Sequence, residues 1–169
     1  MLSFLAVHPP RSRIAHLSHF AVDNGRSVVE FKPRTDRYLV INRLPPAASD
    51  EDVRNKKVPT KANCSLAPPL HWHYYQEETF HVLEGTAKFI LDGKEKIANV
   101  GDTVLIPKQQ FHTFRNASEE TPLSVEFVLD PMMRDHDEAY FSARLGHDII
   151  GYLELTSIRR KYLGLPRRL

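Results

Sequence analysis

Short runs of apolar residues separated by polar turns occupy the middle of the chain. Each run is four to six residues long and rich in β-branched and aromatic side chains, which favour strands. We predict strands at residues 27–32, 38–43, 79–83, 86–91, 94–98, 103–106, 112–115 and 124–129. The Asp92-Gly93 pair between two of them is typical of a tight hairpin turn. Many short antiparallel strands at regular spacing predict a sandwich or barrel.

The pattern changes on both sides of these strands. Residues 44–66 are polar and contain prolines, which predicts a loop with at most one helical turn. In residues 137–153 apolar side chains recur every three or four positions, so we predict an amphipathic helix there, weakened by Gly146 and Gly151. The chain is therefore divided into an N-terminal extension (1–26), a β domain (27–130) and a C-terminal helical extension (131–169).

Composition narrows the class of protein. The chain has 169 residues, of which 41% are hydrophobic and 26% charged, as in a globular domain with its own core. A net charge of +2 argues against a nucleic-acid partner, and the basic residues near the C-terminus are interpreted as a solvated tail. No stretch approaches the roughly 20 apolar residues of a membrane span. With one cysteine and no secretory leader pattern, we expect a cytoplasmic protein.

Four residues have the chemistry and spacing of a metal site. His71 and His73 would lie on one face of an extended segment, with Trp72 on the other. Glu78 follows after a short turn, and His112 lies on a later strand. Imidazole nitrogen and carboxylate oxygen are good ligands for first-row divalent metals. Any one of these histidines alone is better explained as an ordinary polar residue, but the four together favour a metal site.

The same residues carry a resemblance to the cupin family. The first stretch resembles cupin motif one, a His-x-His pair followed by a glutamate and a closing glycine: His71, His73, Glu78 and Gly85. The second resembles motif two, with the expected spacing between glycine, proline, histidine and asparagine: Gly101, Pro107, His112 and Asn116. The family pattern has glycine where this chain has Gln109, which leaves the backbone of that turn open. Fifteen residues separate the two motifs, as in compact cupins.

The resemblance implies an all-β fold, a double-stranded β-helix or jelly roll, here with a C-terminal amphipathic helix. It also implies that residues on the ligands' face line the interior. On the strand at 86–91 either the apolar set (Ala87, Phe89, Leu91) or Lys88 and Ile90 could face inward, and we favour the apolar set. Three phenylalanines are candidates for the wall of a substrate pocket, with core packing as the alternative: Phe80, Phe89 and Phe114. Tyr75 and Gln76 could lie at its mouth, and Glu126 could face inward or lie on the surface.

Three imidazoles and one carboxylate would leave open positions on a divalent metal ion, iron first, with manganese, nickel or zinc as alternatives. The resemblance extends to small fungal cupins assigned as oxidoreductases in polyketide pathways. It implies a metal-dependent oxidoreductase that acts on a small aromatic or polyketide-type metabolite in a biosynthetic pathway. The alternatives are a metal-dependent isomerase, epimerase or cyclase that uses no oxygen, and a non-catalytic small-molecule-binding module. Trp72, His81 and Leu83 on the outward face could join a homodimer or pack within the chain.

Overall fold

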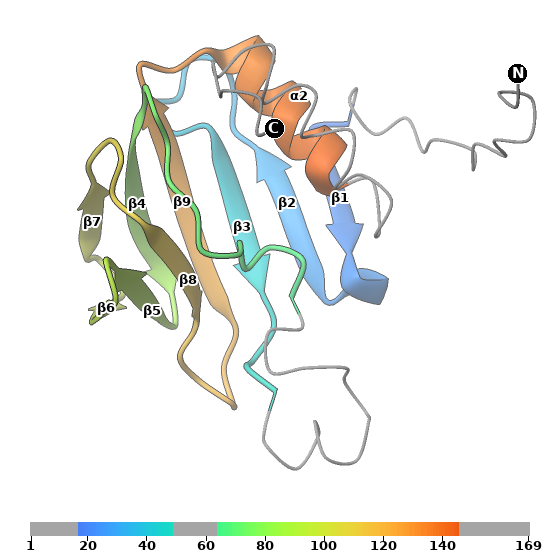
Figure 1. Cartoon of the computed structure of the whole chain (residues 1–169). Helices are drawn as coiled ribbons and strands as arrows, with labels where there is room; N and C mark the ends of the chain where they lie inside the picture. Colours follow the sequence, from blue (N-terminus) through green and yellow to red (C-terminus); the bar gives the residue numbers. More distant parts are fainter. Residues whose placement is uncertain (1–16, 49–63, 146–169) are drawn as a thin grey trace, which may run out of the picture.

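The computed structural model describes residues 17–48 and 64–145. They form two antiparallel sheets and one α-helix, so the predicted fold class is confirmed (Figure 1). One sheet has six strands in the order β1-β2-β3-β9-β4-β7, and the other has three in the order β6-β5-β8. The elements are β1 (His19–Val22), the 3-10 helix η2 (Asp23–Gly25), β2 (Ser27–Phe31), β3 (Val40–Leu44), β4 (Glu77–Glu84), β5 (Thr86–Leu91), β6 (Lys94–Asn99), β7 (Thr103–Ile106), β8 (His112–Asn116), β9 (Leu123–Asp130) and α2 (Arg134–Leu145).

All eight predicted strands are present, with ends shifted by at most two residues. Strand β1 was not predicted; it pairs with β2 as an edge of the six-stranded sheet. Helix α2 begins at Arg134, three residues before the predicted start, where the Asp137 side chain accepts a hydrogen bond from the Met133 N–H (2.9 Å). The part of the predicted helix after residue 145, and residues 49–63 of the predicted loop, lie outside the described residues.

The core lies between the sheets and is rich in phenylalanine. Glu78, Phe80 and Val82 alternate along the buried face of β4, as the period of two predicted. On β5 the apolar set faces inward, since Ala87 and Phe89 are fully buried. The Phe80 ring contacts the rings of Phe89, Phe114 and Phe127 at centroid distances of 5.2, 4.9 and 5.0 Å. Burying each such side chain stabilises the fold by roughly 1.5–3 kcal/mol.

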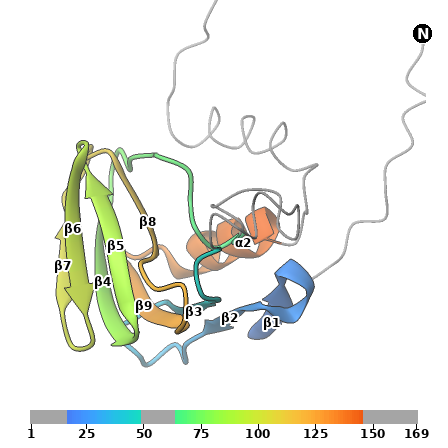
Figure 2. The ribbon, with the colours of Figure 1, turned by 90° about the horizontal axis from the view of Figure 1, so that it is seen from below.

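Helix α2 lies over the β1–β3 part of the six-stranded sheet (Figure 1), and Figure 2 shows it on the same side of that sheet as β5, β6 and β8. Its Phe141 ring packs against Phe127 of β9 at 5.3 Å. Arg134, at the start of the helix, donates hydrogen bonds to the backbone oxygens of Lys32 and Pro33, which ties α2 to the β2–β3 connection. The described part of the chain has no helix long and apolar enough to cross a membrane.

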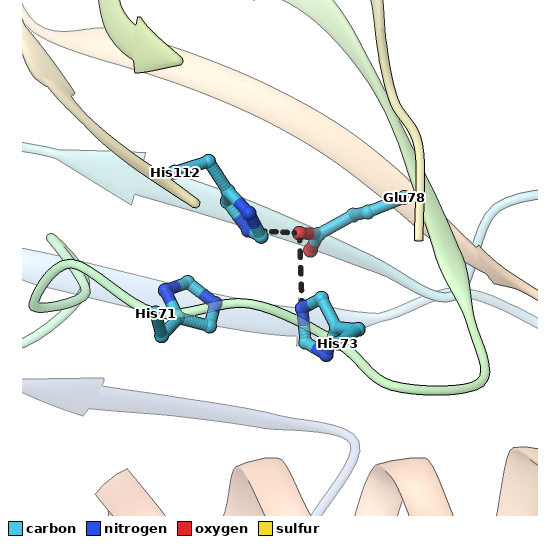
Figure 3. A group of neighbouring side chains, drawn as sticks. All are labelled: His71, His73, Glu78 and His112. Carbon is cyan, nitrogen blue, oxygen red and sulfur yellow. Dashed lines mark hydrogen bonds and ion pairs between the residues drawn. The ribbon is translucent and has the colours of Figure 1, made fainter. Parts of the chain in front are cut away.

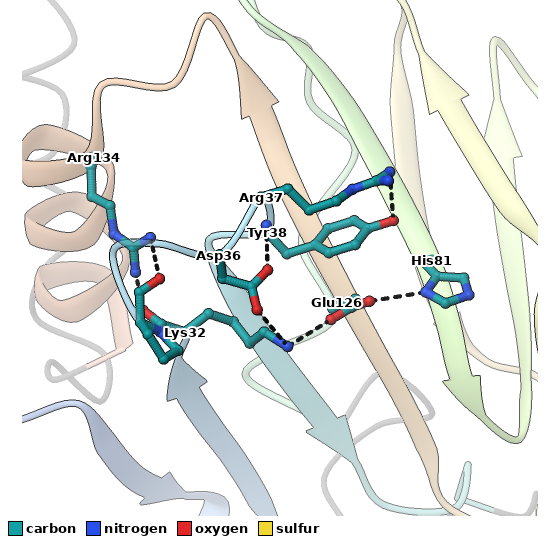
Figure 4. Close-up of polar contacts among 8 residues, drawn as sticks. Lys32, Asp36, Arg37, Tyr38, His81, Glu126 and Arg134 are labelled. Atoms are coloured by element: carbon teal, nitrogen blue, oxygen red, sulfur yellow. Dashed lines mark hydrogen bonds and ion pairs between the residues drawn. The ribbon is translucent and has the colours of Figure 1, made fainter.

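Glu126 faces away from the ligands, on the opposite side of β9 from Phe127, and it is nevertheless buried (Figure 4). Its carboxylate lies 3.1 Å from Lys32 Nζ and 2.9 Å from His81 Nδ1. The His81 ring also stacks on Tyr38, with centroids 6.0 Å apart. His81 therefore contacts residues of its own chain, as one of the two explanations left open by the sequence expects.

Candidate metal centre

The structure brings His71, His73, Glu78 and His112 together, although they come from three separate segments (Figure 3). Each offers one ligand atom, and these four atoms lie within 4.8 Å of one another. Glu78 is on β4 and His112 begins β8, whereas His71 and His73 lie in the segment before β4. Glu77, next to Glu78, is not part of the group.

Backbone hydrogen bonds hold the two early histidines against the β7–β8 turn. His71 and His112 exchange N–H···O bonds of 3.0 and 2.8 Å as an isolated antiparallel bridge. The Gln109 N–H donates to the His73 carbonyl at 2.8 Å. Gln109 has φ +66°, the left-handed conformation that glycine adopts readily. The substitution of the motif glycine therefore leaves a glycine-like turn in place.

Carbonyl groups orient two of the imidazole rings. His71 Nδ1 lies 2.9 Å from the Pro69 carbonyl oxygen, and His112 Nδ1 lies 3.0 Å from that of Gln110. Since a carbonyl only accepts, each Nδ1 carries the proton in a neutral ring, and Nε2 presents its lone pair. This second hydrogen bond is typical of metal-binding histidines.

Glu78 connects the remaining groups. Its Oε2 lies 3.1 Å from His112 Nε2 and 3.4 Å from His73 Nε2. The His73 Nε2 atom is buried and makes no hydrogen bond, which is costly unless another partner occupies the space in front of it. An unsatisfied buried nitrogen beside two imidazoles and a carboxylate fits a divalent metal ion.

The electrostatics keep the carboxylate charged. Burial alone would raise the Glu78 pKa, but the contacts of its carboxylate with His112 and His73 outweigh burial and lower the pKa to about 2. Burial, and repulsion from His112, lower the His71 pKa to about 4, so this ring is neutral at pH 7. Burial would also lower the His112 pKa, but its contact with Glu78 raises it overall. A bound cation would take the place of that proton.

Two cavities adjoin the four residues. The inner one, of about 30 Å³, has room for a water molecule and lies inside the barrel. The predicted wall residues Phe80 and Phe114 line it, whereas Phe89 packs behind these two rings. The outer one, of about 190 Å³, lies between residues 71–76 and the start of α2. Tyr75 and Gln76 line this outer pocket, close to where they were expected.

Sequence reasoning missed three polar residues on the walls of the inner cavity, Asn42, Ser65 and Tyr140. Asn42 is 5% exposed, and its Oδ1 has no hydrogen-bond partner. Its alternation with buried Val40 and Leu44 on β3 was a usable signal, because an amide among inward apolar residues needs a partner. Tyr140 gave no such signal, since only the packing of α2 brings it to the cavity.

Comparisons with known proteins agree with this geometry. Residues 64–129 match the family model described as "Cupin domain". A protein named "Probable oxidoreductase virH" from Hypocrea virens is 27% identical over 88% of this chain, and this chain spans 64% of its length. Quercetin 2,3-dioxygenase from Bacillus subtilis is 33% identical over 41% of this chain and 22% of its own length. Among solved structures, an RmlC-like cupin from Shewanella frigidimarina has a TM-score of 0.47 and 14% identity, covering 69% of this chain and 86% of that one. Residues 64–129 thus belong to a cupin domain, and the chain carries a group of three histidines and one glutamate that could hold a metal ion.

Proposed function

We propose that this protein is a metal-dependent oxidoreductase that acts on a small aromatic or polyketide-type molecule in a biosynthetic pathway. The observation that carries the proposal is the convergence of three imidazoles and one carboxylate beside a pocket lined with aromatic side chains. His71, His73, Glu78 and His112 are the proposed ligands. A bound divalent ion, iron first and manganese, nickel or zinc as alternatives, would supply a Lewis-acidic and, for iron, redox-active centre with open coordination positions.

The side chains around the pocket favour a flat, largely apolar substrate. Residues from two segments line it: Trp72, Tyr74 and Tyr75 from the ligand segment, and Tyr140 and Phe141 from α2. Aromatic rings pack against one another with a preference for stacked or edge-on contacts, so such a wall selects planar molecules. The ionised Glu78 would neutralise only part of the charge of a bound divalent cation, so the site would remain positive and would attract a phenolate or enolate oxygen.

The two named relatives support the same reaction class. One name gives an oxidoreductase, and the other gives a dioxygenase acting on quercetin, a planar polyphenol. Both resemblances are distant, so the reaction and the substrate are proposals for this chain.

The test is oxygen uptake by protein loaded in turn with Fe(II), Mn(II), Ni(II) or Zn(II). Quercetin and a panel of simpler phenols and polyketide-type aromatics serve as substrates, each with and without oxygen. We expect substrate-dependent oxygen uptake with iron, abolished in Glu78→Ala and retained in the matched Glu77→Ala. If product formed equally well without oxygen or another electron acceptor, the oxidoreductase proposal would be wrong and the isomerase or cyclase alternative would be favoured. A ligand that binds and stays unchanged would point to the binding module.

The proposed pocket wall can be tested separately. Leucine variants of Phe80, Phe89 and Phe114 all lose ring packing in the core. Because only Phe80 and Phe114 line the inner cavity, we expect their variants to raise KM for substrate more than Phe89→Leu does, at equal metal content. An equal rise in KM in all three variants would mean that these residues contribute only to core packing.

A further inference from the structure

One face of α2 forms the wall opposite the proposed ligands. Helix residues spaced by three and four line the outer pocket, namely His136, Asp137, Tyr140 and Phe141, together with Met133 just before the helix. The facing wall is the segment from His71 to Gln76. In Figure 3 the helix ribbon lies on the side of His71 and His73. A molecule in this pocket would therefore contact α2 and the ligand segment at the same time.

The position of α2 against the ligand segment is held by Gln76, which lies between His73 and Glu78 in the sequence. Its Nε2 donates to the Pro131 carbonyl at 3.0 Å and lies 3.4 Å from each carboxylate oxygen of Asp137. The Asp137 side chain is 3% exposed and also accepts the Met133 N–H. Because the Asp137 carboxylate is buried and hydrogen-bonded, this contact fixes the start of the helix against the ligand segment.

Tyr140 lies where the two cavities meet, since it lines both the outer pocket and the inner cavity. The other residues common to both are His71, His73 and Phe141. The two histidines are proposed ligands and Phe141 is apolar, so Tyr140 brings the one remaining polar side chain to the junction. Within residues 17–48 and 64–145, the Tyr140 hydroxyl has no hydrogen-bond partner.

We propose that Tyr140 is a specificity-determining residue whose hydroxyl hydrogen-bonds an oxygen of the substrate, a planar phenol or enol, at the entrance to the metal centre. The proposal rests on the proposed function for its substrate class. A phenolic oxygen can donate to and accept from the Tyr140 hydroxyl, whereas a hydrocarbon of the same shape leaves it unpaired. The aromatic walls bind the ring, and Tyr140 selects for the oxygen.

The test uses metal-free protein and a built-in reporter. Trp72 is the only tryptophan of the chain and lines the outer pocket, so its single indole N–H signal in a ¹H–¹⁵N NMR spectrum reports binding there. The probes are 2-naphthol and naphthalene, which differ by one hydroxyl. We expect Tyr140→Phe to weaken 2-naphthol binding about threefold to tenfold, the range for one lost neutral hydrogen bond, and to change naphthalene binding less than twofold. The control, Tyr38→Phe, makes the same chemical change on the opposite face of the six-stranded sheet and should change neither.

Each alternative result contradicts the proposal. Equal weakening of both probes would mean that Tyr140 only packs, and no Trp72 shift with 2-naphthol in the unmodified protein would mean that the pocket takes no planar phenol. Because no metal is present, the outcome is separate from that of the oxygen-uptake experiment. If Tyr140→Phe weakened 2-naphthol binding selectively and the protein showed no oxygen uptake, the proposed role of Tyr140 would hold and the oxidoreductase proposal would be wrong. The same Trp72 titration in iron-loaded protein should preserve the preference for 2-naphthol.

Discussion

The backbone N–H of Gln109 donates to the carbonyl of His73 across 2.8 Å, from a residue held at φ +66°. This contact couples the β7–β8 turn to a histidine of the candidate metal centre. A side chain in the left-handed region costs about 1–2 kcal/mol, partly offset because glycine loses more conformational freedom on folding.

We therefore expect Gln109→Gly to raise the free energy of unfolding by about 0.5–1 kcal/mol in denaturant unfolding, with metal content unchanged. Gln110→Gly is the matched control, since Gln110 is not among the described residues with positive φ and donates to Asp92. That variant should be destabilised. Destabilisation of Gln109→Gly as well would show that the glutamine side chain contributes contacts that outweigh the strain.

The choice between the two adjacent glutamates is open to a direct test. Glu78 is buried within the group of four, whereas Glu77 is half-buried on the other face of β4. We expect Glu78→Ala to lose bound metal in elemental analysis and Glu77→Ala to keep it. Equal loss in both would mean that the carboxylate contributes no ligand and acts only through the fold.

Metal binding should stabilise the protein by linkage. At 100 times the dissociation constant, a metal stabilises the folded state by about 2.7 kcal/mol, which a chelator would remove. The comparison is the difference in melting temperature with metal and with chelator, measured for each variant. We expect the melting temperature of His112→Ala to be the same with metal and with chelator. His81→Ala should retain the difference seen in the unmodified protein, since His81 faces Glu126 on the other side of β4. A chelator without effect on the unmodified protein would argue against the site.

Metal-free protein should have a stability maximum near pH 6.5. The pKa of His71 is lowered from 6.5 to about 4, so the unfolded chain takes up this proton first, and stability falls as the pH drops from 6.5 to 4. The pKa of His112 is raised above 6.5, so its contribution is complete below pH 6.5 and is lost as the pH rises through the folded-state pKa. Denaturant unfolding in chelator at several pH values checks this. His71→Asn should flatten the acid side, and a steady rise in stability from pH 6.5 to 4.5 would contradict the prediction.

Gly85 closes the first motif for a steric reason. A Cβ added there would lie 2.3 Å from the Pro122 carbonyl oxygen, and the residue has φ +78°. Gly93 has a similar φ of +81° with nothing within 4 Å of an added Cβ, so it provides the control. We expect Gly93→Ala to cost about 1 kcal/mol of strain and Gly85→Ala at least 2 kcal/mol, measured as free energies of unfolding. Equal losses would mean that the chain near Pro122 moves aside easily.

Alternation along single strands was enough to predict much of this protein. A period of two decides which side chains share a face, so Glu78, Phe80 and Val82 could be assigned to the interior without a structure. The motif spacing likewise gave the four residues that the structure brings within 4.8 Å. The helix was predicted less well, because its start depends on the Asp137 side chain capping the Met133 N–H, an interaction that the apolar pattern does not record.

Tertiary structure decided what alternation could not. The sequence left open whether Glu126 faces inward or outward. In the structure it faces outward and is nevertheless buried, because Lys32 and His81, which are distant along the chain, pack against it. Only the structure showed that Gln109 adopts the glycine-like φ of +66° and directs its backbone N–H at the His73 carbonyl. Tyr140 reaches the cavity only because α2 folds back over the sheet, about 60 residues beyond Glu78. Local sequence sets which way a side chain points from its own element, but its neighbours are set by long-range packing, which depends on the whole chain at once.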